Sequence, residues 1–153
     1  MKTLADRVSA FINAEGHLTQ TDTSNENATG IGFSSRGLKY TAWSMHDDDT
    51  FLQLSCAMGL EAVVFDAPLL RALWDCQAGF KSVKFSLERD STLFVCSLEV
   101  FFARPEGYQP TFWRSVSVIE TALHAGLNEI GKYSSTKSAA EKFMEELSQG
   151  DAR

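Results

Sequence analysis

KSVKFSLERDSTLFVCSLEVFFA, residues 81–103, is the stretch that decides the fold. β-Branched and aromatic residues dominate it, which predicts two strands joined by a tight turn at Asp90–Ser91. One face of this hairpin is then apolar and the other mostly polar, a pattern typical of an antiparallel sheet covered on one side only. The register that follows pairs Leu87 with Phe94, Phe85 with Cys96 and Val83 with Leu98.

A second hairpin is predicted upstream, from the strands 37–45 and 51–58 and the five-residue link HDDDT at 46–50. Its length places one apolar set of side chains on one face and a mixed set on the other. A short strand is expected at 30–34. The polar stretch 19–29 has no apolar period and is expected to be a loop. The expected pairs are Leu38 with Met58, Tyr40 with Cys56, Ala42 with Leu54, Lys39 with Ala57, Thr41 with Ser55, Trp43 with Gln53, and Met45 with Phe51.

Helical periodicity predicts three helices, at 3–14, 66–77 and 111–130. Thr3 and Asp66 are the expected N-caps of the first two. Gly131 and the following SST run are expected to end the third helix, and a capping box at Ser138 opens an amphipathic helix over 138–148. The buried stripe expected in the second helix consists of Leu69, Leu70, Leu73 and Trp74.

These elements predict an α+β domain in which an antiparallel sheet of about five strands has all three helices on one face. We expect one domain at 1–133, followed by a C-terminal amphipathic helix and tail at 134–153. The chain of 153 residues is long enough to bury a core without a metal or disulfide.

Composition narrows the classes of partner. The net charge of −6 and the absence of a basic cluster argue against nucleic acid and against an anionic membrane surface. No apolar run approaches the length of a membrane span, and the amino terminus lacks a signal-peptide pattern. The three cysteines form no CxxC motif, so we expect a reducing cytoplasm in which each thiol is a core residue.

No catalytic signature stands out, and no cofactor or metal is expected. The cluster His46–Asp49 fails as a calcium loop, because counting from Asp47 places Leu52 at position 6 and Met58 at position 12. We interpret it as a solvated hairpin turn. A Cys–His pair brought together only by folding stays open as an alternative to inert thiols.

Apolar side chains on the mixed face of both hairpins are the best candidates for a functional surface. The first interpretation is scattered surface residues, or residues covered by the N-terminal segment or the helix 138–148. The second is a protein-binding or dimerisation surface. The residues concerned are Trp43, Met45, Phe51, Leu93, Val95 and Phe101.

The order of elements, helix, three strands, helix, two strands, long helix, resembles the type III secretion chaperone-like fold. Within that fold the chain is most similar to the YbjN family of sensory transduction regulators. Many of its members have an Asn near the end of the central helix, where this chain has Asp75, Cys76 and Gln77. The resemblance covers roughly residues 3–130. The residues that carry it are Leu69, Leu73 and Trp74, then Val83, Phe85 and Leu87, then Leu93–Val95, then Thr111, Phe112, Ile119 and Leu123.

The resemblance implies a non-catalytic protein-binding domain, since the family shares no catalytic residues. Secretion chaperones of this fold are small, acidic, cytoplasmic homodimers that bind extended segments of a client. Two alternatives remain open: a small enzyme or ligand-binding domain whose site is assembled only in the fold, and an immunity-type inhibitor. A deep polar pocket with a perturbed Cys, His or carboxylate favours the enzyme or ligand-binding domain, and a flat apolar groove favours protein binding.

Overall fold

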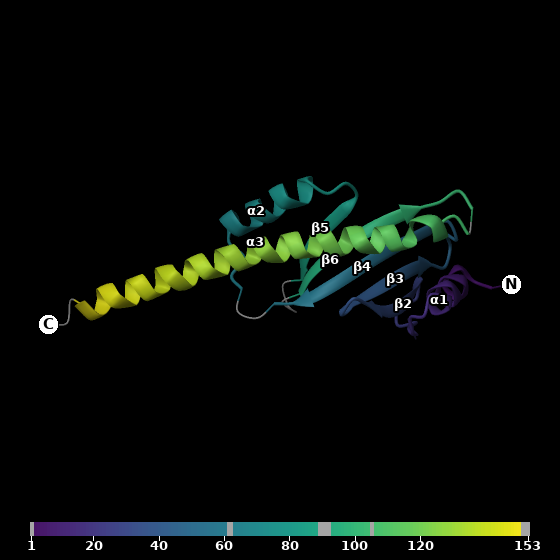
Figure 1. Cartoon of the computed structure of the whole chain (residues 1–153), viewed down its shortest axis with the longest axis horizontal. Helices are drawn as coiled ribbons and strands as arrows, with labels where there is room; N and C mark the ends of the chain where they lie inside the picture. The colour runs from purple at the N-terminus through teal and green to yellow at the C-terminus, as the bar shows by residue number, and fades with distance from the viewer. Residues whose placement is uncertain (1, 61–62, 89–92, 105, 151–153) are drawn as a thin grey trace.

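A computed structural model describes residues 2–60, 63–88, 93–104 and 106–150, with the backbone alone for 134–150. Figure 1 shows a single sheet with a long helix running lengthwise across it. The elements in chain order are α1 (Leu4–Ala14), β1 (Thr19–Asp22), β2 (Ala28–Ser35), β3 (Leu38–Met45), β4 (Phe51–Gly59), α2 (Ala67–Ala78), β5 (Val83–Glu88), β6 (Leu93–Phe101) and α3 (Gln109–Gly150).

The sheet has six strands in the order β1-β2-β3-β4-β6-β5, and every neighbouring pair is antiparallel. The predicted registers are confirmed by the paired residues of both hairpins, including Tyr40 opposite Cys56 and Phe85 opposite Cys96. The pairing of β3 with β4 spans Tyr40–Ser44, so the outermost predicted pairs of that hairpin are not part of it. The predicted turn at Asp90–Ser91 lies outside the described residues. Pairing between β4 and β6 joins the two hairpins into one sheet.

Two strand predictions need correction. The stretch 19–29 is not wholly a loop, because Thr19–Asp22 forms the edge strand β1 and β2 already begins at Ala28. β1 is held by its pairing with β2 and by Thr19, whose hydroxyl lies 2.7 Å from the Ser9 hydroxyl of α1. A strand held by main-chain pairing and side-chain hydrogen bonds needs no alternation of apolar residues, so its sequence does not reveal it.

The first two helices begin at the predicted caps. Thr3 and Asp6 form a capping box at α1: the Thr3 hydroxyl accepts from the Asp6 amide at 3.1 Å, and the Thr3 amide donates to the Asp6 carboxylate at 2.9 Å. The Asp66 carboxylate accepts from the Leu69 amide at 3.2 Å, and Pro68 lies in the first turn of α2. The helix boundaries therefore follow from local hydrogen bonding that the sequence already displays.

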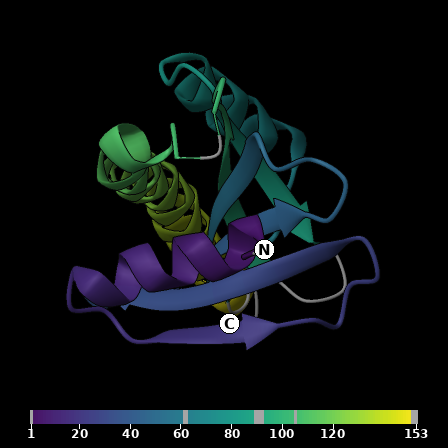
Figure 2. The same cartoon turned by 90° about the vertical axis from the view of Figure 1, so that its right-hand side faces the viewer.

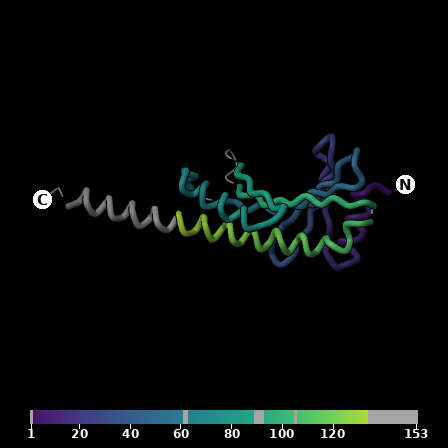
Figure 3. Tube along the Cα trace, turned by 90° about the horizontal axis from the view of Figure 1, so that it is seen from above, coloured from purple at the N-terminus to yellow at the C-terminus, as the bar shows by residue number. Residues whose placement is uncertain are grey.

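The three helices cover one face of the sheet, as predicted. Figure 2 shows α1 lying over the strands at one end, and Figure 3 shows α3 running along one side of the sheet. One hydrophobic core joins Val8 and Ile12 of α1, Leu69 of α2 and Leu123 of α3 with the inward-facing strand residues. These side chains are nearly inaccessible to solvent, so they supply most of the hydrophobic stabilisation.

The predicted end of the third helix at Gly131 is wrong, because α3 continues from Gln109 to Gly150. It therefore crosses the boundary expected between residues 133 and 134. Whether side chains of 138–148 cover the second face of the sheet lies outside the described residues. Among the helices that the structure describes, none combines the length and the hydropathy needed to cross a membrane.

Candidate functional site

The face of the sheet opposite the helices gathers apolar side chains at one end. Phe51 pairs with Phe101, and their ring centroids lie 5.0 Å apart. Phe101 is 72% exposed, whereas Phe51 is half-buried. Met45 ends β3 and Phe51 begins β4, so the hairpin between them places Met45 beside this pair. An exposed aromatic ring packed on a second ring is a preformed apolar contact surface.

Trp43 completes this group from the adjacent position on β3. Its ring lies over Gly30 of β2, where an added Cβ atom would come within 2.9 Å of the indole Cζ3. A side chain at position 30 would thus displace the indole, so the glycine provides the space in which Trp43 lies flat. We call Trp43, Met45, Phe51 and Phe101 the aromatic end.

A polar belt separates the aromatic end from the other two predicted residues. Ser55 pairs with Ser97 in this belt, and Lys84 forms a 2.6 Å ion pair with Glu99. Leu93 and Val95 lie beyond it, where they pair with Gly59 and Ala57. Val95 and Phe101 are six residues apart on one strand, about 20 Å. The six predicted residues therefore do not form one patch, and only four of them come together.

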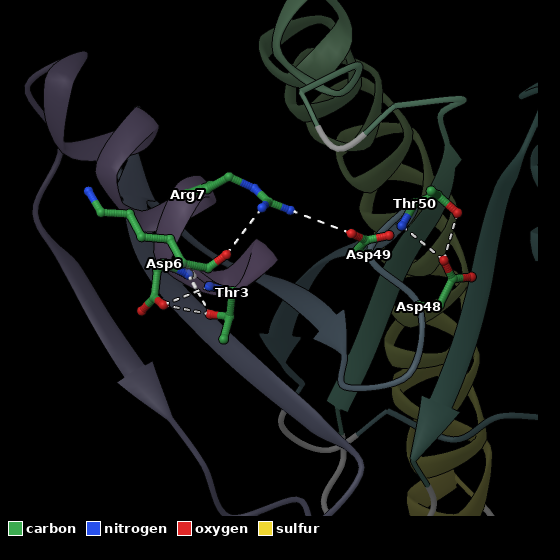
Figure 4. Close-up of polar contacts among 7 residues, drawn as sticks. Thr3, Asp6, Arg7, Asp48, Asp49 and Thr50 are labelled. Carbon is green, nitrogen blue, oxygen red and sulfur yellow. Dashed lines mark hydrogen bonds and ion pairs between the residues drawn. The ribbon is translucent and has the colours of Figure 1, made fainter.

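The acidic β3–β4 hairpin is held by its own hydrogen bonds. One carboxylate oxygen of Asp48 accepts from the Thr50 amide at 2.9 Å and from the Thr50 hydroxyl at 2.6 Å. These hydrogen bonds keep the pKa of Asp48 below its usual value. Asp49 lies 4.0 Å from the Arg7 guanidinium, which connects the hairpin to α1 (Figure 4). Within the described residues, no three His, Cys, Asp or Glu side chains come together as a metal-binding group.

A cavity of about 380 Å³ lies between this hairpin and the first turn of α1. Its lining mixes two cationic side chains, Lys2 and Arg7, with His46 and Asp49. The His46 Nε2 atom lies 2.9 Å from the Thr29 hydroxyl, and Arg7 donates to the Lys2 carbonyl at 3.1 Å. These hydrogen bonds satisfy His46 and one nitrogen of Arg7, whereas the Nε and Nη2 atoms of Arg7 are buried without a hydrogen-bond partner among the described residues.

A second apolar surface lies at α2, where the predicted buried stripe is only half correct. Leu69 and Leu73 are buried, but Trp74 is 73% exposed and Leu70 is 46% exposed. Leu70 and Trp74 line a groove of about 210 Å³ with Phe85 and Leu87 of the edge strand β5. Gln77 lies in the same groove, where its side-chain oxygen accepts from the Phe85 amide at 2.7 Å. The sequence signal for this second face is that apolar residues in α2 come in consecutive pairs, Leu69–Leu70 and Leu73–Trp74, of which one member is buried and the other exposed.

The cysteines are free thiols on the helix-covered side. Cys56 pairs directly with Cys96 across β4 and β6, and both are buried, whereas Cys76 of α2 is half-buried. Burial raises the pKa of Cys56 to about 11 and that of Cys96 to about 12. Both thiols are therefore protonated near neutral pH and poorly nucleophilic in the folded chain.

Comparisons with known proteins support the fold. No family model and no curated protein matches the chain. A crystal structure of an uncharacterized protein from Methanothermobacter thermautotrophicus is similar, with a TM-score of 0.64 and 12% sequence identity. The match covers 85% of this chain and 98% of that one. At this identity the likeness shows a shared fold. The resemblance to the YbjN family therefore stays a prediction.

Proposed function

We propose that the chain is a non-catalytic protein-binding domain whose aromatic end contacts another polypeptide, either a second copy or an extended client segment. The observation that carries the proposal is Phe101, which is 72% exposed yet packed against Phe51. The helix residues that belong to the hydrophobic core pack on the opposite face. A large aromatic side chain in this position is unfavourable in water and favourable in an interface.

The expected binding energy comes from removing these side chains from water. Apolar surface contributes about 25 cal/mol per Å², and an aromatic side chain buries about 150–250 Å². Phe101 therefore supplies roughly 3 kcal/mol when its exposed part is covered, before the costs of association. The polar belt, with its Lys84–Glu99 ion pair, forms the rim on the inner side of this surface.

The resemblance to YbjN-type regulators and type III secretion chaperones supports this proposal, because the secretion chaperones of this fold bind extended segments of a client. A cytoplasmic location is part of the proposal, since an odd number of cysteines without a CxxC motif is typical of proteins in a reducing compartment. The proposal contains no reaction step. Burial keeps Cys56 and Cys96 protonated, which argues against a nucleophilic thiol at either position.

The test compares Phe101→Ser with Leu18→Ser. Leu18 is 91% exposed and lies outside the aromatic end, so it controls for loss of an exposed apolar side chain. Both variants should keep their stability within about 0.5 kcal/mol, since neither side chain is in the core. Molecular mass over a concentration series, by sedimentation equilibrium, measures self-association. If the partner is a different protein and not a second copy, a photo-crosslinking residue at position 101 should capture it in an extract of the source cells.

The proposal is supported if binding can be reconstituted from purified components and if Phe101→Ser weakens it at least tenfold while Leu18→Ser does not. The proposal fails if the chain stays monomeric and position 101 captures no polypeptide beyond those captured from position 18. Tenfold corresponds to about 1.4 kcal/mol, well within the contribution expected of Phe101.

The groove between α2 and β5 is a second surface for the same function. Trp74, at 73% exposure, is the observation that favours it. An extended segment can pair with the edge strand β5 there, in the manner of strand addition. Trp74→Ser distinguishes the two surfaces, because it weakens partner binding only if the groove is used. Loss of binding in Trp74→Ser with no effect of Phe101→Ser would move the site to the groove.

A further inference from the structure

The direct pairing of Cys56 with Cys96 is the feature from which we draw a further inference. These two residues face each other on neighbouring antiparallel strands, and both side chains lie in the core on the helix-covered side. They come from different hairpins, on the strands β4 and β6, which α2 and β5 separate in the sequence. The fold thus brings together two of the three thiols of the chain.

Hydrogen bonding at the neighbouring strand fixes the geometry of this pair. The Phe85 amide points away from β6, because it donates to the Gln77 side chain. Phe85 pairs with Cys96, so this is a non-hydrogen-bonded pair, and the main-chain groups of Cys96 must point toward β4. Cys96 and Cys56 are consequently a hydrogen-bonded pair, in which the Cα atoms lie about 5.5 Å apart. Disulfides most often have Cα separations of about 5.5–6 Å.

We propose that Cys56 and Cys96 form a reversible disulfide that links the two hairpins across the middle of the sheet. The oxidant is a small disulfide such as oxidised glutathione. One cysteine attacks it as a thiolate and releases one glutathione thiol. The second cysteine then attacks the mixed disulfide and releases another. Two protein thiols thus lose two electrons and two protons, and one glutathione disulfide becomes two glutathione thiols.

Two properties follow from the environment of the pair. Oxidation of the folded chain is slow, because both thiols are buried and their pKa values are raised, so the reaction needs transient separation of the strands or takes place during folding. The Cβ atoms of directly opposed residues start about 5 Å apart, farther than in a relaxed disulfide. The bond is therefore strained and easily reduced, as is usual for reversible disulfides.

The test uses the full chain carrying Cys76→Ser, in which Cys56 and Cys96 are the remaining thiols. The chain is refolded from urea with a mixture of oxidised and reduced glutathione, and the thiols left are alkylated in denaturant. Intact mass should show a monomer that carries no alkyl group and has lost about 2 Da, the mass of the two hydrogens removed when the disulfide forms. The folded, reduced protein should react at least tenfold more slowly than the refolding chain.

In the wild-type chain all three thiols are present, so Cys76 can compete with Cys56 and Cys96 for disulfide formation. Peptide mapping should link Cys56 to Cys96 and leave Cys76 alkylated. Two alkylated thiols in Cys76→Ser after refolding, or a bond that includes Cys76 in the wild type, would each overturn the proposal.

Discussion

Replacing two glycines of α3 by alanine should change stability in opposite directions. Gly126 is buried, and a Cβ atom there would lie 2.5 Å from Cζ and 2.7 Å from Cε1 of the Phe94 ring. Gly131 is exposed, and apart from its own turn of the helix no described atom lies within 4 Å of its Cβ position. The same substitution in the same helix therefore separates helix propensity from packing.

The magnitudes follow from these distances. In a helix interior, Gly→Ala gains about 1 kcal/mol from propensity, so Gly131→Ala should raise the free energy of unfolding by about 0.5–1 kcal/mol. At Gly126 the Phe94 ring must retreat by about 1 Å to reach an ordinary carbon–carbon contact. Phe94 has no exposed surface and packs edge-on against Phe85, so it has little room to move. Overpacking costs about 1–3 kcal/mol, which leaves Gly126→Ala destabilised by up to about 2 kcal/mol.

Urea unfolding followed by circular dichroism measures both free energies. A third variant tests the cause, because Phe94→Leu removes the ring that the added methyl group at position 126 would meet. Adding Gly126→Ala to Phe94→Leu should then stabilise the chain. If Gly126→Ala stabilises the wild type as much as Gly131→Ala does, α3 does not rest on Phe94 and the packing argument is refuted.

Two further predictions follow from the caps and the buried thiols. Thr3→Ala should lower the free energy of unfolding by about 1 kcal/mol, because it removes the capping box of α1, and an unchanged urea midpoint would contradict that role. Alkaline pH should also destabilise the chain. The folded pKa of Cys56 is about 11 and that of Cys96 about 12, against an ordinary value of 9.0, so above pH 9 the unfolded chain loses these protons while the folded chain retains them. Stability is then complete below pH 9 and falls by roughly 1 kcal/mol per buried thiol by pH 10, and urea unfolding with a reductant at pH 8, 9 and 10 should show this loss.

Much of the fold could be predicted because local rules decide it. Within a hairpin, the side-chain period of two and the length of the connection fix which residues face each other, as Tyr40 and Cys56 do. Thr3 and Asp66 were recognisable as caps because their hydrogen bonds reach only three residues along the chain. Strand β1 was missed because its polar residues carry no alternation, and it depends on pairing with β2.

The candidate site was harder to predict, because it depends on contacts between elements. The alternation of side chains along a strand assigned both Val95 and Phe101 to the second face of the sheet. The polar belt between them appears only once β6 is paired with β4, which places the two residues on either side of it. Periodicity placed Trp74 in a buried stripe, yet α2 lies beside the edge strand β5, where the sheet ends and nothing described covers the indole. The opposition of Cys56 and Cys96 likewise follows only from the pairing between hairpins.

The position of the aromatic end argues against chance scatter. A sheet face that no described helix side chain covers must tolerate water, and its middle does so through Ser55 and the Lys84–Glu99 ion pair. Scattered apolar residues would interrupt this belt at random. Instead Phe51 and Phe101 are direct partners on neighbouring strands, and Trp43 has a glycine beneath its ring. Side chains that support one another in this way bury apolar surface together when a partner arrives, which a single exposed residue cannot do.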